Sequence, residues 1–100
     1  MGLPTRKLLT IVTEAAIEGV LLRDLERLGA QGYTVSEARG KGSRGVRNAD
    51  WDASRNVRIE VVCDAPTAQR VAEHLQARYY DDYGMILFVT DITVLRAEKF

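Results

Sequence analysis

The order in which strand-like and helix-like segments follow one another is the strongest constraint that this sequence puts on its fold. Short runs of apolar and β-branched residues alternate with longer segments in which apolar residues recur at helical spacing. The expected strands are residues 7–12, 33–39, 56–63 and 85–90, with a short fifth strand at 91–95. The expected helices begin near Thr13 and Asp64. This order predicts an α+β, ferredoxin-like βαββαβ domain with an antiparallel sheet.

The first and last main strands are apolar on both of their faces. Right-handed crossovers place both helices on one face of the sheet, and the opposite face should then be polar at every second position. Residues 8–9, 11–12 and 85–89 break that rule with consecutive apolar side chains. A chain of 100 residues makes a single domain, residues 1–100, with no second domain to cover this face. We therefore expect another copy of the chain to cover it, and scattered apolar exposure is the alternative.

Each expected helix has one apolar stripe. In the first helix the stripe comprises Ile17, Val20, Leu21, Leu25 and Leu28. In the second helix it comprises Ala68, Val71, Ala72, Leu75 and Tyr79. Asp64 suits the N-cap of the second helix and Pro66 its first turn. His74 lies off the stripe, which is typical of a surface histidine.

Composition argues against several classes of function. Fourteen Lys and Arg balance fourteen Asp and Glu, whereas a general nucleic-acid-binding domain is normally basic. No apolar run approaches the length of a membrane span, and the first residues do not resemble a signal segment. Cys63 is the only cysteine, which excludes an intrachain disulfide and a cysteine-based zinc cluster. These features predict a cytoplasmic protein without a bound metal.

The segment from Arg39 to Arg47 gathers four cations and three glycines without a single acidic residue. Glycine lets backbone N–H groups approach a ligand closely, and consecutive N–H groups form anion-binding nests. Arginine and lysine add charge-assisted hydrogen bonds to phosphate or carboxylate oxygens. The surrounding loop, about residues 40–55, is long for a structureless connection, which favours a functional role. The segment predicts a site for a small anion, with a solvated flexible loop as the alternative.

Other residues offer weaker signals, and none of them forms a catalytic set. Trp51 is the only tryptophan, and in a loop it predicts either a partner contact or packing against the domain's own surface. Glu14 follows the first strand at the end of the sheet nearest the loop and is a weak candidate for the same cleft. The single histidine lies far from any marked nucleophile. We therefore expect a non-enzymatic protein with no catalytic residues.

Several motifs together resemble the PII-like signalling proteins, over about residues 7–95. The similar segments are residues 7–14 (KLLTIVTE), 32–35 (GYTV), 40–44 (GKGSR), 46–47 (VR) and 79–83 (YYDDY). Within that family they are similar to the carboxysome-associated PII proteins and to the PII-like regulator of the cyanobacterial bicarbonate transporter. The long loop would then be the family's T-loop. It has no tyrosine, so uridylylation is not implied, and nothing in it indicates 2-oxoglutarate.

The resemblance implies a homotrimer that binds adenine nucleotides in the clefts between its subunits. Phosphates would lie against Gly40, Lys41, Gly42, Ser43, Arg44 and Arg47. The adenine and ribose side would be formed by Thr34, Tyr83, Gly84 and Met85. The implied ligands are AMP and ADP, with ATP, cyclic AMP and bicarbonate as further candidates. No catalytic cofactor is implied.

The implied role is regulation of inorganic-carbon uptake in a carbon-concentrating mechanism. The T-loop, including Trp51, would contact a bicarbonate transporter and so recruit the protein to the inner face of the membrane. A ferredoxin-like RNA-binding domain is the alternative, but it would need aromatic residues on the open sheet face, where the third strand offers Arg58 and Glu60. A metal-tolerance trimer of similar shape ranks lower because the chain lacks a histidine–cysteine ligand set.

Overall fold

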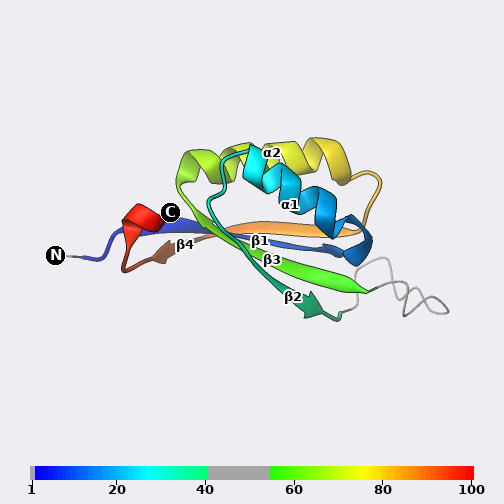
Figure 1. The fold of residues 1–100 in the computed structure, drawn as a ribbon, viewed down its shortest axis with the longest axis horizontal. Helices are drawn as coiled ribbons and strands as arrows, with labels where there is room; N and C mark the ends of the chain where they lie inside the picture. The colour runs from blue at the N-terminus through cyan, green and yellow to red at the C-terminus, as the bar shows by residue number, and fades with distance from the viewer. Residues whose placement is uncertain (1, 41–54) are drawn as a thin grey trace.

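Four antiparallel strands form one sheet, and two helices lie across one of its faces (Figure 1). The computed structural model describes residues 2–40 and 55–100. The strands, in the spatial order β2-β3-β1-β4, are β1 (Thr5–Glu14), β2 (Thr34–Ala38), β3 (Asn56–Cys63) and β4 (Met85–Thr93). The helices are α1 (Glu18–Arg27) and α2 (Ala65–Tyr79), with short 3-10 turns η1 (Ala15–Ile17) and η3 (Ala97–Lys99). The predicted α+β, ferredoxin-like fold with an antiparallel sheet is confirmed.

The core lies between the helices and one face of the sheet. Its largest fully buried apolar side chains are Leu9, Ile11, Ile59 and Val61 from the strands and Leu21, Leu25, Val71 and Leu75 from the helices. The strand β3 contributes to this core through its odd-numbered residues, which are buried from Val57 to Cys63, while its even-numbered residues face the other way. Cys63 is 4% exposed, and burial together with the charge of Asp64 raises the pKa of its thiol. No helix in the described residues has the length and apolar character that crossing a membrane requires.

The second helix begins as its sequence predicts. The carboxylate of Asp64 accepts a hydrogen bond from the backbone N–H of Thr67 at 2.9 Å, and proline occupies the first turn. This cap satisfies one of the N–H groups that a helix start leaves unpaired. Every member of the predicted stripe is buried except Ala72, which is half-buried.

Three predictions about the ends and the buried faces of these elements were wrong. Thr13 and Glu14 belong to β1 because they pair with Val57 and Asn56 of β3, so the helical segment starts only at Ala15. The predicted fifth strand is the continuation of β4, which stays paired with β1 as far as Thr93. Val20 of the predicted apolar stripe is 40% exposed, so the buried face of α1 is narrower than expected.

The face of the sheet turned away from the helices is partly apolar. Cross-strand register places on it Leu8, Thr10 and Val12 of β1, Thr34, Ser36 and Ala38 of β2, Arg58, Glu60 and Val62 of β3, and Ile86, Phe88 and Thr90 of β4. Ile86 is 56% exposed and Phe88 45% exposed. Thr10, which pairs with Phe88, is fully buried, and the described residues offer its hydroxyl oxygen no hydrogen-bond partner. We name this surface the open face.

A buried carboxylate links the two helices. Asp24 of α1 is 7% exposed and accepts hydrogen bonds from the hydroxyl of Tyr79 and from Arg27, the latter at 2.9 Å. Nε2 of His74 lies 3.2 Å from the same carboxylate. The prediction that His74 is a plain surface residue was therefore wrong, because the histidine is half-buried against Asp24.

This network sets a pH window for stability. Burial and the hydrogen bond to Asp24 raise the pKa of Tyr79 from 10.0 to about 12. Burial alone would raise the pKa of Asp24, but hydrogen bonds from Tyr79 and His74 and the charges of His74 and Arg27 outweigh it and hold that pKa below 3.8. The tyrosine contribution is thus present below pH 10 and is lost as the pH rises toward 12, whereas the aspartate contribution is lost below about pH 3.8.

We expect Tyr79→Phe to remove the alkaline half of this pH dependence. Two pKa units correspond to about 2.7 kcal/mol, which is the upper limit of what the native chain should lose from Tyr79 between pH 10 and 12. Urea unfolding at pH 7, 10 and 11.5 measures the loss in both proteins. A variant that loses as much stability as the native chain over this range would contradict the assignment.

Candidate functional site

The predicted anion-binding segment connects two paired strand ends. Ala38, the last residue of β2, pairs with Asn56, the first residue of β3, so Gly40 emerges beside the start of β3. Arg39 and Arg55 are both exposed at this junction, and both carry positive charge to the end of the sheet. The remaining predicted phosphate ligands and the predicted partner contact lie outside the described residues; these are Lys41, Gly42, Ser43, Arg44, Arg47 and Trp51.

The turn before β4 reaches the same end of the sheet. Met85, the first residue of β4, pairs with Thr13, and Gly84 directly precedes it. Tyr83 is half-buried, and its ring centroid lies 6.1 Å from that of Tyr79. The structure therefore brings Gly40 and the residues Tyr83, Gly84 and Met85 to one end of the sheet, which we name the loop end.

Two consecutive side chains of β1 hold the peptide groups of Gly84. The hydroxyl of Thr13 donates a hydrogen bond to the carbonyl oxygen of Gly84 at 2.8 Å. The carboxylate of Glu14 accepts one from the Gly84 N–H, also at 2.8 Å. Thr13 is 1% exposed, whereas Glu14 is half-buried. Both backbone polar groups of Gly84 are therefore fixed from one neighbouring strand.

Within one chain, the two parts of the predicted site lie at opposite edges of the sheet. Gly40 follows β2 at one edge and Gly84 precedes β4 at the other, with β3 and β1 between them. Three strand spacings separate these edges by about 14 Å. Thr34 lies at the opposite end of β2, four residues before Ala38 and paired with Glu60. The structure therefore does not bring Thr34 close to Gly84 in the same chain.

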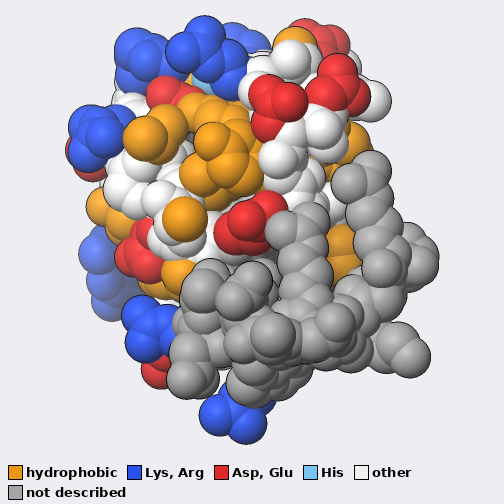
Figure 2. Space-filling view, turned by 90° about the vertical axis from the view of Figure 1, so that its right-hand side faces the viewer, with side chains coloured by type: hydrophobic (Ala, Val, Ile, Leu, Met, Phe, Trp, Pro, Cys, Tyr) orange, Lys and Arg blue, Asp and Glu red, His pale blue; other side chains and the backbone are white. Residues whose placement is uncertain are grey.

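The middle of the loop end is formed by the ends of β1 and β3. Glu14 pairs with Asn56, and the N–H of Ala15 donates a hydrogen bond to the carbonyl oxygen of Arg55 at 2.7 Å. Figure 2 looks onto this end of the molecule and shows apolar and acidic side chains close together there. Glu14 thus lies between the two predicted halves of the site, one strand away from Gly84.

The sequence revealed only part of this arrangement. It marked Glu14 by its position after a strand, but it gave no signal for the contact between Glu14 and Gly84, which are 70 residues apart. Thr13 was assigned to a helix and so was missed as a partner of Gly84. The sequence signals that could have identified them are the polar pair directly after an apolar strand and the family-like segment 7–14, which ends in this pair.

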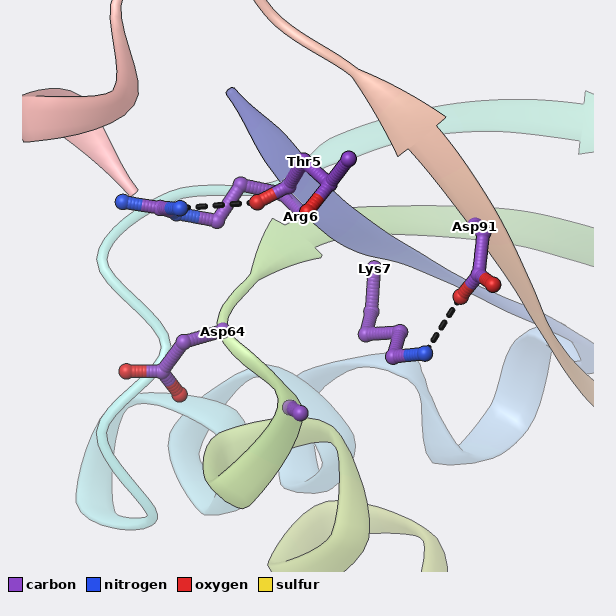
Figure 3. Close-up of a pocket in the computed structure, with 6 residues that line it drawn as sticks. Thr5, Arg6, Lys7, Asp64 and Asp91 are labelled. Atoms are coloured by element: carbon purple, nitrogen blue, oxygen red, sulfur yellow. Dashed lines mark hydrogen bonds and ion pairs between the residues drawn. The ribbon is translucent and has the colours of Figure 1, made fainter.

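A hollow of about 220 Å³ lies at the opposite end of the sheet (Figure 3). It is lined by Thr5, Arg6, Lys7, Asp64, Ala65 and Asp91. Lys7 forms an ion pair with Asp91, and Arg6 donates hydrogen bonds to the carbonyl oxygens of Thr5 and Ala97. Two cations and two carboxylates balance one another here. Lys7 and Glu14 are seven residues apart on β1, about 23 Å along the strand, so this hollow is not part of the loop-end site.

The described residues do not suggest metal chemistry. No group of three or more histidine, cysteine, aspartate or glutamate side chains within residues 2–40 and 55–100 is arranged to hold a metal ion. The buried carboxylate of Asp24 is already engaged in hydrogen-bond contacts with the side chains of Tyr79, His74 and Arg27.

Comparison with known proteins places this architecture in a family. The model of the nitrogen regulatory protein P-II family matches residues 6–99. The chain is similar to a PII-like signalling protein from Thermus thermophilus, with 42% identity, coverage of 100% of this chain and 99% of that chain, and a TM-score of 0.85.

It is also similar to CPII from Thiomonas intermedia, a nitrogen regulatory PII-like protein whose structure was solved bound to ADP, AMP and bicarbonate. The identity is 28%, the coverage is 99% of this chain and 96% of that chain, and the TM-score is 0.84. These matches agree with the order of the strands and with the long connection between β2 and β3. The chain belongs to the nitrogen regulatory protein P-II family.

Proposed function

We propose that this protein is a non-enzymatic PII-like signalling protein that binds AMP and ADP at clefts between the subunits of a homotrimer. The observation that carries the proposal is its similarity over 99% of its length to CPII, which was solved with ADP, AMP and bicarbonate bound. ATP and cyclic AMP are further candidate ligands, and bicarbonate is a candidate second ligand because a guanidinium group pairs well with planar oxyanions.

The proposed phosphate side comprises Gly40, Lys41, Gly42, Ser43, Arg44 and Arg47. The proposed adenine and ribose side comprises Thr34, Tyr83, Gly84 and Met85. The separation of Gly40 and Gly84 across the sheet, and the distance of Thr34 from Gly84, support a site that residues of two subunits complete together. The charges of Arg39 and Arg55 favour phosphate at the β2 side of the loop end.

The open face supports the trimer. Ile86 and Phe88 form exposed apolar surface on β4, and the buried hydroxyl of Thr10 beside Phe88 has no partner among the described residues. A copy of the same chain supplies apolar surface of the same kind, which cyclic symmetry allows three subunits to share. RNA binding is not favoured, since the central strands β1 and β3 place no aromatic side chain on this face.

We further propose that the segment at about residues 40–55 acts as a T-loop that reports the bound nucleotide to a partner. Trp51 is the proposed partner contact. The partner that fits best is a bicarbonate transporter, which would recruit a cytoplasmic regulator to the inner face of the membrane. Regulation of inorganic-carbon uptake in a carbon-concentrating, carboxysome-linked setting is the corresponding role.

Calorimetric titration with AMP, ADP, ATP and cyclic AMP, each with and without bicarbonate, tests the ligand. We expect saturable heat with ADP and AMP at one site per chain. Absence of heat with every nucleotide would reject the nucleotide-binding proposal. If a nucleotide binds and its binding heat is the same with and without bicarbonate, only the proposal that bicarbonate is a second ligand is rejected.

The double variant Lys41→Ala, Arg47→Ala tests the phosphate side. Each lost charge-assisted hydrogen bond should weaken binding by about 1.5–3 kcal/mol, so the loss of both should lower ADP affinity at least about a hundredfold. Adenosine carries no phosphate, and its affinity should stay nearly unchanged. Equal losses for ADP and adenosine would contradict the proposed roles of these two side chains.

A further inference from the structure

We infer that Glu14 is the residue that recognises the ribose of the bound nucleotide. This inference rests on the proposed function and deepens it by assigning one specificity-determining side chain. It starts from the contact between Glu14 and Gly84, a residue of the proposed adenine and ribose side. A group that touches Gly84 from the neighbouring strand lies within reach of a ligand bound there.

The carboxylate of Glu14 is held in place before any ligand arrives. Its Oε2 accepts the N–H of Gly84 at 2.8 Å, and Gly84 is held in turn by the hydroxyl of Thr13 at 2.8 Å. Thr13 is almost fully buried, so this support is rigid. A side chain that is fixed in advance loses little conformational freedom on binding, which makes its hydrogen bonds to a ligand more effective.

The chemistry of the group matches ribose better than phosphate or adenine. An ionised carboxylate only accepts hydrogen bonds, and it has about four lone-pair positions, of which Gly84 occupies one. The 2′- and 3′-hydroxyls of ribose are neutral donors, and an acidic side chain is the usual partner of a ribose hydroxyl in dinucleotide sites. Phosphate offers acceptors and negative charge, so Glu14 repels it.

Charge at the loop end therefore orients the ligand. In the proposed cleft between subunits, Arg39 and Arg55 of one subunit lie on the phosphate side, and Glu14 lies beside Gly84 of the neighbouring subunit, on the ribose side. A nucleotide is charged at its phosphate end and neutral at its ribose. The arrangement favours phosphate toward the arginines and the ribose hydroxyls toward Glu14.

The inference is tested by comparing ADP with 2′-deoxy-ADP and 3′-deoxy-ADP in calorimetric titrations. Removing one hydroxyl removes its hydrogen bond to a charged group, and this loss lowers the affinity about ten- to hundredfold. We therefore expect the native chain to bind at least one of the two deoxy nucleotides about ten- to hundredfold more weakly than ADP. The readout is the ratio of the affinity for ADP to the affinity for the deoxy nucleotide. In Glu14→Ala this ratio should fall to about one, because no carboxylate remains to distinguish the hydroxyls.

Glu14→Gln keeps an acceptor for Gly84 but removes the charge, so its ratio should lie between those of the native chain and Glu14→Ala. Glu26→Gln is the matched control, because Glu26 is an exposed glutamate near the far end of α1 and loses the same charge. A merely structural role of Glu14 would weaken ADP and the deoxy nucleotides equally and leave the ratio unchanged.

The outcomes separate the inference from the proposed function. ADP binding to the native chain with no preference over either deoxy nucleotide overturns the role of Glu14 and leaves nucleotide binding intact. The same holds if Glu14→Ala retains the native preference. No ADP binding to the native chain overturns both proposals together.

Discussion

Replacing Phe88 with aspartate should leave the chain folded but convert the proposed trimer into monomers. Phe88 is 45% exposed on the open face, so a single chain tolerates a polar residue there. In an assembly, each copy would lose about 1.5–3 kcal/mol of apolar burial and would place a carboxylate in the interface. Because the change enters three copies at once, association should weaken by several orders of magnitude. Sedimentation velocity measures the mass, and circular dichroism measures the fold.

Val20→Asp is the matched control for this variant. Val20 is 40% exposed on α1, on the side of the sheet away from the open face, so its replacement should leave the trimer intact. Calorimetry adds a second readout, since a cleft shared by two subunits disappears in a monomer and Phe88→Asp should lose ADP binding. A trimeric Phe88→Asp protein would show that the open face is not the interface between subunits.

Replacing Asp24 with alanine should cost about 2–4 kcal/mol of unfolding free energy. Asp24 is buried between the helices, and its removal leaves the hydroxyl of Tyr79 and the ring of His74 without their partner. A buried donor without an acceptor carries the full cost of its lost hydration. Urea unfolding at pH 7 measures the change through a shift in the midpoint.

Two further variants separate the buried network from its exposed edge. The Arg27 side chain is 60% exposed, so Arg27→Ala should cost less than about 1 kcal/mol although Arg27 also contacts Asp24. Asp24→Ala combined with Tyr79→Phe should cost less than the sum of the single changes, because the unpaired hydroxyl is removed as well. Additive costs would indicate that the two groups do not act as a unit.

Local sequence patterns predicted most of the fold because they reflect local physics. The alternation from Val57 to Cys63 sets the bounds of β3, and Asp64 with Pro66 sets the start of α2. The errors fell where distant pairing decides the structure. Thr13 and Glu14 are strand residues because β3 and the Gly84 turn lie beside them, and residues 91–93 extend β4 because β1 continues opposite them.

The candidate site was harder to predict than the fold. Glycine and charge identified the segment that starts at Gly40, and family resemblance pointed to Gly84. Neither signal predicts the order of the strands in the sheet. That order places Gly40 and Gly84 at opposite edges. The hydrogen bonds that join β1 to Gly84, and those that join His74 and Tyr79 to Asp24, bridge 50 to 71 residues and arise only when the sheet and helices have packed.

The shielded position of Cys63 has a practical consequence. This thiol is the only one in the chain, and it is 4% exposed in the core. Because its pKa is also raised, little of it is present as the thiolate that reacts with alkylating reagents. A cysteine introduced at any accessible position will therefore react alone. A maleimide dye or nitroxide attached there would report on conformation in the native background, without first replacing the resident sulfur.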